Sequence, residues 1–363
     1  MSERLAFEPN WISAPGNTIA DALEERGWSQ LELAQRLSMS PKFVNQLVRG
    51  KATLSTDTAM LLATVLGSTP EFWLRLEANY RTGLARREQL EQLAPHVAWL
   101  DELPVAAMAR LGWIAKLTRP VEKVAACLRF FGVASVEAWR ETCERPLAAY
   151  RKSAKFEQKP GAVAAWLRQA EIQAGQVAVG RFQVEAFQRE LRQLRVLTRE
   201  PNPAVFVPEL VKRCAAHGVA VVLVPAPDGC RASGATKWLG DKAVLALSLR
   251  HKTDDHLWFT FFHEAFHLIL HGKRMLFIES LDGLDDAEER EADRAAADLL
   301  IPPELAAGLL GMPWKADLAE QVAERWGIAP GVVVGRLQHD GIWPRNVGNN
   351  LKVSYTWEGR EHG

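Results

Sequence analysis

The sequence predicts a multidomain protein with an all-α head, a helical middle region and, after them, an α+β domain. Three observations support this fold class. The first 87 residues hold short, closely spaced helices with clear capping signals, and helical patterns continue from 88 to 200. A Pro-rich segment at residues 200–203 then precedes runs of aliphatic and β-branched residues typical of strands. We expect domains at 1–87, 88–200, 201–303 and 304–363, because 363 residues suffice for several cores.

Composition and charge exclude several classes of protein. With 48% hydrophobic and 24% charged residues, the chain is neither disordered nor fibrous. Lys+Arg and Asp+Glu both number 44, so any affinity for nucleic acid has to come from a local basic patch. Four cysteines without a CxxC pair do not make a disulfide framework, and we expect them to be reduced. Neither a membrane-spanning run nor a secretory leader is evident, so we expect a cytoplasmic protein without membrane contact.

Two short helices joined by a tight turn are predicted within the head. Residues 29–32 form a capping box that opens the first helix. Ser40 caps the second helix, Pro41 occupies its first position, and Gly50 provides a left-handed stop. A longer amphipathic helix is expected over residues 70–86.

In the second short helix, apolar and polar side chains fall on opposite faces. Its inward face is apolar, and its outward face carries one row of basic and amide side chains: Lys42, Asn45, Gln46 and Arg49. Asn and Gln can pair with adenine, Arg with guanine and Lys with phosphate. Because residues 36–51 contain four basic residues and no acidic one, this helix is the candidate DNA-binding surface.

The middle region carries no chemistry that we recognise. Residues 145–159 hold five basic residues against one Glu, a segment that can contact phosphate. A solvated loop is the interpretation that we prefer for it.

An aromatic helix expected between Asp254 and Gly272 contains the motif HEAFH. Its two imidazoles, His263 and His267, are four residues apart and leave the helix on one face, separated by about 6 Å along the axis. Both can therefore bind one zinc ion. Glu264 lies beside them and can take a proton from the attacking water and pass it to the leaving amine of a peptide. The motif predicts a zinc site with Glu264 as its general base.

A third protein ligand has to come from elsewhere. His271 lies about 12 Å from His263 along the helix axis, too far to share one ion. The next helix offers three acidic residues, Glu288, Glu289 and Glu291. We choose Glu291, because the alanines that follow it allow the two helices to approach closely.

The segments HEAFHLILH and EREADRAAADLLIP resemble the ImmA/IrrE metallopeptidases, which cleave repressor proteins. The resemblance implies a zincin-like α+β domain with Zn²⁺ on His263, His267 and Glu291, and with Glu264 as the base. It also implies that a protein substrate lies extended along a strand edge, which we place at residues 243–249.

Residues 18–87 resemble the helix-turn-helix of Xre/HigA regulators and antitoxins, notably in WSQLELAQRLSMS, NQLVRGK and LGSTPEFWLRLEANY. The resemblance implies a homodimer that binds palindromic double-stranded operator DNA with its second short helix in the major groove. We therefore expect a DNA-binding transcriptional regulator that carries its own zinc metallopeptidase domain. The alternative is a non-enzymatic HigA-like repressor or antitoxin, possessing a cognate toxin, whose zinc site is structural or sensory.

Overall fold

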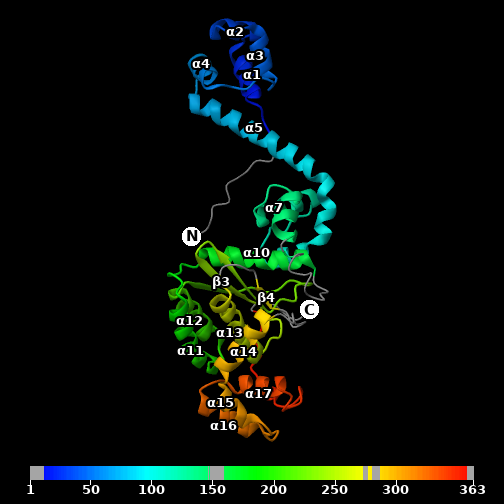
Figure 1. Cartoon of the computed structure of the whole chain (residues 1–363). Helices are drawn as coiled ribbons and strands as arrows, with labels where there is room; N and C mark the ends of the chain where they lie inside the picture. Colours follow the sequence, from blue (N-terminus) through cyan, green and yellow to red (C-terminus); the bar gives the residue numbers. More distant parts are fainter. Residues whose placement is uncertain (1–11, 146, 148–158, 273–276, 280–286, 358–363) are drawn as a thin grey trace. The chain divides into compact units, whose positions relative to one another are not determined.

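The computed structural model describes residues 12–145, 147, 159–272, 277–279 and 287–357. The chain divides into two compact units, Met1–Pro95 and His96–Gly363 (Figure 1). The fold class is as predicted: the described part of the first unit is helical, and the second unit adds a small sheet to its helices. Most of the basic segment 145–159 lies outside the described residues, so the solvated loop stays a prediction.

The helices of the first unit begin where the sequence places its caps. Ser29 Oγ accepts a hydrogen bond from Glu32 N at 3.1 Å, Ser40 Oγ accepts one from Phe43 N at 3.2 Å, and Gly50 has a φ of 64°. In order, the helices are α1 (Pro15–Arg26), α2 (Gln30–Leu37), α3 (Pro41–Val48), α4 (Thr56–Leu66) and α5 (Pro70–Leu93). Their apolar faces enclose one core that includes Leu33, Val44, Leu62 and Trp73. Helix α5 continues past the boundary that we expected at residue 87.

Helices also fill the described part of the middle region. Trp99, Phe131 and Trp139 form an aromatic cluster with ring centroids 5.3, 5.7 and 6.3 Å apart. The elements there are η1 (Ala94–Glu102), α6 (Val105–Arg110), α7 (Pro120–Phe131), α8 (Val136–Trp139), η2 (Arg140–Glu144), α10 (Pro160–Gln176), α11 (Val184–Leu194) and η3 (Arg195–Arg199). Trp166 Nε1 donates to Val224 O at 2.9 Å, which ties α10 to the sheet.

The sheet has the strand order β1-β3-β2-β4. Its strands are β1 (Val219–Leu223), β2 (Gly234–Leu239), β3 (Lys242–Leu247) and β4 (Phe277–Glu279). Strand β3 is parallel to β1, whereas β2 is antiparallel to both β3 and β4. The substrate edge that we expected at residues 243–249 is therefore wrong. Strand β3 lies inside the sheet, and its backbone groups pair with neighbours on both sides.

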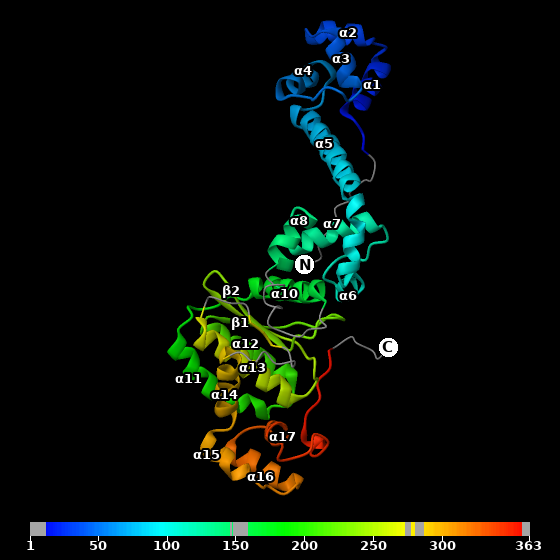
Figure 2. The same ribbon diagram turned by 45° about the vertical axis from the view of Figure 1, so that its right-hand side comes forward.

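Helices cover both faces of the sheet. Helix α10 contacts β1 and β3 on one face, and α13 (Asp254–Leu270) contacts β2, β3 and β4 on the opposite face (Figure 2). Helix α12 (Pro203–Ala216) packs on β1, and both α14 (Ala287–Leu300) and α17 (Pro330–His339) pack on α13. Helix α13 is thus the buried central helix that its apolar sequence predicts.

One hydrophobic core crosses two of the expected domain boundaries. It includes Phe187, which precedes residue 200, and Trp343, which follows residue 303. The C-terminal elements that join α17 around this core are α15 (Pro303–Ala306), η5 (Ala307–Leu309), α16 (Ala316–Trp326) and η6 (Asn349–Leu351). The segments 201–303 and 304–363 therefore share buried side chains.

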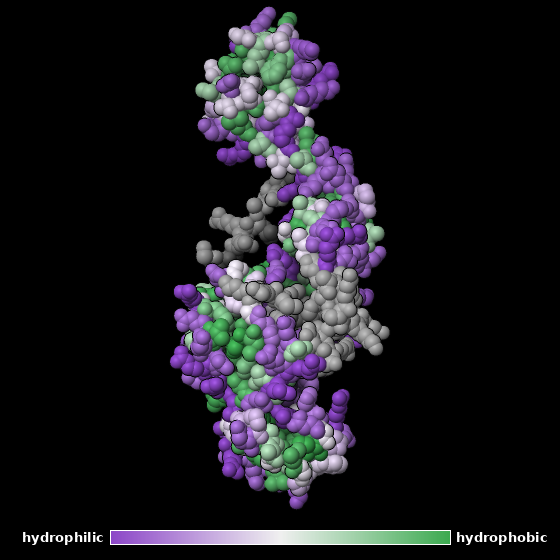
Figure 3. Space-filling view, in the orientation of Figure 1, coloured by the Kyte–Doolittle hydropathy of each residue, from purple (hydrophilic) through white to green (hydrophobic). Residues whose placement is uncertain are grey.

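The visible surface and the state of the cysteines are those expected from the composition. Hydrophilic residues take up much of the visible face in Figure 3. All four cysteines are free thiols, as expected. Among the described residues, no helix is both long enough and apolar enough to cross a membrane.

Candidate functional site

The candidate metal centre is built on α13, whose ends have clear physical causes. Asp254 and Asp255 stand in its first turn, where carboxylates interact favourably with the positive end of the helix dipole. Gly272 follows its last turn with a φ of 64°, a conformation that favours glycine. Every residue from 260 to 268 is buried, so the HEAFH motif lies in the interior of the second unit.

The two motif histidines converge with one carboxylate from α14. His263 Nε2 and His267 Nε2 are 2.9 Å apart. Glu289 Oε2 lies 3.2 Å from His263 Nε2 and 3.5 Å from His267 Nε2. Within the described part of the chain, these three residues are the group whose metal-ligating atoms all lie within 4.8 Å of one another.

This donor set fits a zinc ion. Zinc binds imidazole nitrogen and carboxylate oxygen at about 2.0–2.2 Å, so tetrahedral geometry places its ligand atoms about 3.3 Å apart. The observed separations of 2.9, 3.2 and 3.5 Å bracket that value. Burial lowers the pKa of His267, which keeps its ring neutral and its lone pair available. Burial would raise the pKa of Glu289, but contacts with His263 and His267 outweigh it and hold the pKa at about 2.

The carboxylate of Asp293 lies beside one of the two imidazoles. Its Oδ1 lies 2.8 Å from His263 Nδ1, as an ion-pair contact on the side of the ring away from Nε2. A carboxylate at Nδ1 favours the tautomer with the proton on that nitrogen, which leaves the Nε2 lone pair for a metal. Asp293 is not among the residues predicted from the sequence, although it follows Glu289 by one helical turn.

The structure brings Glu289, and not Glu291, to the histidines. Glu291 is exposed, whereas Ala292 and Ala296 are fully buried on the face of α14 that meets α13. Glu289 precedes Ala292 by three residues and therefore shares that face, while Glu291 is rotated about 100° away from Ala292. Our choice of Glu291 does not fit this geometry. The sequence offers no signal for this choice, because it does not show which alanines of α14 face α13.

Glu264 is completely buried between α13 and the sheet. The α carbon of Gly234 on β2 approaches it so closely that a Cβ there would lie 2.6 Å from Glu264 Cγ and 2.7 Å from Glu264 Oε1. The same Cβ would lie 2.6 Å from Thr260 Cγ2. Glycine at this position makes the room that the glutamate side chain occupies.

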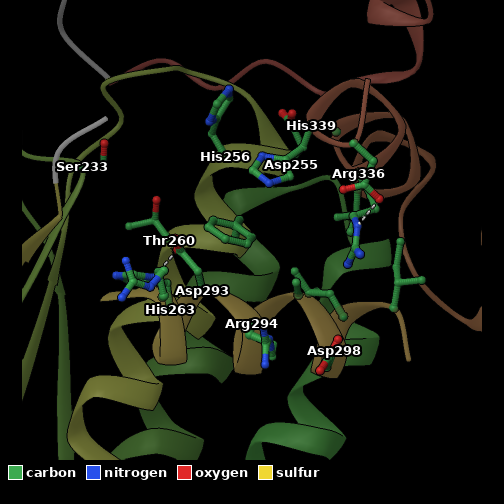
Figure 4. Close-up of a pocket in the computed structure, with 18 of the residues that line it drawn as sticks. Ser233, Asp255, His256, Thr260, His263, Asp293, Arg294, Asp298, Arg336 and His339 are labelled. Atoms are coloured by element: carbon green, nitrogen blue, oxygen red, sulfur yellow. Dashed lines mark hydrogen bonds and ion pairs between the residues drawn. The ribbon is translucent and has the colours of Figure 1, made fainter. Parts of the chain in front are cut away.

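A cavity of about 750 Å³ opens beside the candidate metal centre. His263, Glu289 and Asp293 lie in its wall, and α17 contributes Arg336 and His339 on the other side (Figure 4). Glu264 and His267 are not among the residues that line it. The cavity can therefore hold a side chain or a short peptide segment next to His263 and Glu289.

His271 is not part of the ligand cluster. Its ring centroid is 5.2 Å from that of His267, and its Nε2 lies 3.2 Å from the carbonyl oxygen of Glu288. Among the described residues, the metal-ligating atoms that converge belong to His263, His267 and Glu289.

Helix α3 presents the four residues expected to contact DNA. Lys42 and Arg49 are exposed, and Asn45 and Gln46 are half-buried. Asn45 Nδ2 donates to Gln30 Oε1 at 3.0 Å, so Gln30, at the first position of α2, holds the Asn45 side chain. Gln30 is not among the residues predicted from the sequence to act in DNA binding.

One member of the basic patch is already paired. Arg36 Nη2 lies 2.9 Å from Glu32 Oε1, and its guanidinium sits 3.8 Å from the centroid of the Trp28 ring. Glu32 stands just outside the segment 36–51 whose charge we counted. Lys42, Arg49 and Lys51, the other basic residues of this segment, are exposed.

Two segments of the chain, one in each unit, match known protein families. Residues 19–74 match the helix-turn-helix family, and residues 214–338 match the IrrE N-terminal-like domain of the M78 peptidase family. The uncharacterized HTH-type transcriptional regulator YddM of Escherichia coli (strain K12) is 36% identical over 63 residues, which are 17% of this chain and 67% of that protein. Virulence-associated protein I of Dichelobacter nodosus is 29% identical over 76 residues, 21% of this chain and 70% of that protein.

A solved structure is similar over a small part of the chain. An addiction module antidote protein of the HigA family from Coxiella burnetii is 30% identical, with a TM-score of 0.22 over 23% of this chain and 90% of that one. The candidate metal centre on α13 and α14 lies within residues 214–338, the segment that matches the IrrE N-terminal-like domain. The chain belongs to the DNA-binding helix-turn-helix regulators and carries, behind its helix-turn-helix, an IrrE N-terminal-like domain of the M78 peptidase family.

Proposed function

We propose that this regulator binds operator DNA through α3 and that its second unit is a zinc peptidase acting on a repressor-type protein. One observation carries the enzymatic half: three metal-ligating side chains converge, and two of them lie in the wall of a cavity of about 750 Å³. Structural zinc sites are usually closed by four protein ligands, whereas catalytic sites use three and keep one position open. Three ligands beside a cavity support a catalytic site.

The chain's own residues divide the chemistry among them. His263, His267 and Glu289 would hold the ion, and Asp293 would orient His263. Bound zinc supplies a Lewis acid that acidifies water and polarises a peptide carbonyl. Glu264 takes a proton from the attacking water and passes it to the amine as the C–N bond breaks. Water thus adds its oxygen to the carbonyl carbon, and the products are a carboxylic acid and an amine.

The sheet supports a revised position for an extended substrate. In the order β1-β3-β2-β4, strand β4 is at an edge, and it contacts α13. An edge strand offers unpaired backbone groups to which an extended peptide can add as a further strand. We therefore place substrate pairing at β4 instead of residues 243–249.

Zinc content tests the ligand set directly. The purified full chain should hold about one zinc ion, and Glu289→Ala should lose it as fully as His263→Ala or His267→Ala. Glu291→Ala is the matched control, because it removes an exposed carboxylate from the same turn of α14. Loss of zinc from Glu291→Ala with retention by Glu289→Ala would reject this assignment.

Glu264→Gln tests the chemistry. It should keep zinc and fold but abolish cleavage of the protein substrate, which is followed in cells by gel analysis of candidate repressors. Equal cleavage by wild type and variant would exclude Glu264 as the base.

One observation favours the non-enzymatic alternative. Glu264 is completely buried and is absent from the cavity wall, so in this conformation its carboxylate does not face the space that a substrate would occupy. A repressor or antitoxin with a sensory or structural zinc site would need no exposed base. Target-gene regulation that is unchanged by Glu264→Gln but lost in Glu289→Ala would support this alternative, and a cognate toxin would then be sought as the partner.

The DNA-binding half rests on Lys42, Asn45 and Gln46 of α3 and on Arg49 directly after it, of which Lys42 and Arg49 are exposed. We propose that the chain acts as a homodimer whose paired α3 helices read inverted half-sites about 34 Å apart. Arg49→Ala should weaken binding to the specific operator, whereas Lys42→Ala, if it meets phosphate, should weaken binding to all sequences alike. Footprinting of the chain's own promoter at several salt concentrations distinguishes the two effects.

A further inference from the structure

His271 directly follows the last residue of α13, and backbone groups of His271 and Gly272 form hydrogen bonds there. His271 N donates to His267 O at 3.1 Å, and the next residue, Gly272, turns the chain with a φ of 64°. Trp238 Nε1 on β2 donates to Gly272 O at 3.0 Å. These contacts fix the direction in which the His271 ring leaves the helix.

The ring reaches across to the beginning of α14. His271 Nε2 lies 3.2 Å from Glu288 O, and because a carbonyl oxygen can only accept, the imidazole nitrogen is the donor. Helix α14 begins at Ala287, so this bond falls on its first turn. The residue that follows Glu288 is Glu289, whose carboxylate completes the candidate metal centre.

We propose that His271 is a positioning residue, which holds the first turn of α14 so that Glu289 meets His263 and His267. This inference rests on the proposed zinc site. Glu289 Oε2 is 3.2 and 3.5 Å from the two imidazole nitrogens, and a first turn that shifts by about 1 Å would take the carboxylate out of the range that a shared ion requires. Partners that orient metal ligands typically change metal affinity by about 10- to 100-fold when they are removed.

The experiment measures the zinc affinity of the full chain by competition with a fluorescent chelator. His271→Ala should weaken zinc binding by about 10- to 100-fold, and His271→Gln, which keeps an N–H donor of similar reach, should recover most of it. His339→Ala is the matched control, because it removes an exposed imidazole from the cavity wall and should leave the affinity unchanged.

A double-mutant comparison separates positioning from general stabilisation. If His271 acts through Glu289, His271→Ala should cost less zinc affinity in a Glu289→Gln background, which keeps a weaker oxygen ligand and a measurable affinity, than in the wild-type chain. An equal loss in both backgrounds, or an unchanged affinity of His271→Ala, would overturn the inference. A wild-type chain that binds no zinc would instead overturn the proposed function itself, so the two failures are distinguishable.

Discussion

The close approach of Gly234 to Glu264 predicts a sharp effect of one added methyl group. In Gly234→Ala the new Cβ would lie 2.6 Å from both Glu264 Cγ and Thr260 Cγ2. Carbon atoms pack best at about 3.5–4.0 Å, so the neighbours must move by about 1 Å. Strand β2 cannot retreat easily, because residue 234 pairs with β3 on one side and with β4 on the other.

The magnitude follows from overpacking in a buried site. Inserting one methyl group without room typically costs about 1–3 kcal/mol of unfolding free energy. For a folded unit of this size, that corresponds to a fall in melting temperature of roughly 2–12 °C. If the Glu264 side chain moves instead of the strand, a carboxylate displaced by about 1 Å would lower the proposed peptidase activity by about 100-fold.

Calorimetry of the full chain measures the stability effect. Gly175→Ala is the matched control, because Gly175 lies within α10 and a Cβ there meets nothing within 4 Å. That change should leave stability unchanged or raise it slightly, since alanine favours helix over glycine. In a Glu264→Ala background, the cost of Gly234→Ala should shrink, because two of its three close contacts are gone. A cost no greater than that of Gly175→Ala, or no coupling to residue 264, would refute the reasoning.

Three further predictions concern other parts of the chain. Burial, with a contribution from the neighbouring Asp255 charge, raises the pKa of Asp254 from 3.8 to about 6. The folded state therefore binds the Asp254 proton more tightly than the unfolded state does. As a result, the free energy of unfolding falls as pH rises from about 4 to 6. Asp254→Asn should remove this pH dependence. Its free energy of unfolding, measured by denaturant titration, should therefore rise relative to that of the wild type by up to about 3 kcal/mol between pH 4 and 7. Because Gln30 holds Asn45, their alanine variants should affect operator binding non-additively in a double-mutant cycle, whereas additive losses would show that the hydrogen bond plays no part in DNA binding. Burial raises the pKa of Cys127 to about 12, so mass spectrometry should find it alkylated by iodoacetamide at pH 8 only in denaturant.

Local features of the fold were predictable because their causes are local. The caps at Ser29 and Ser40 depend on a hydroxyl three residues from a backbone N–H, a relation set within one helical turn. His263 and His267 share a helical face by their spacing alone, and the structure places their Nε2 atoms 2.9 Å apart. In contrast, the described part of β4, Phe277–Glu279, is too short for a periodic hydrophobic signal.

By itself, the sequence determined where the caps of the two short head helices stand and that His263 and His267 share one face of their helix. These properties follow from contacts between residues at most a few positions apart. Only the tertiary structure decided the position of β3 inside the sheet and the rotation of α14, which presents Glu289 and turns Glu291 to solvent. That rotation is set by the packing of Ala292 and Ala296 on α13, and such packing is a property of two helices meeting, which the period of one helix does not contain.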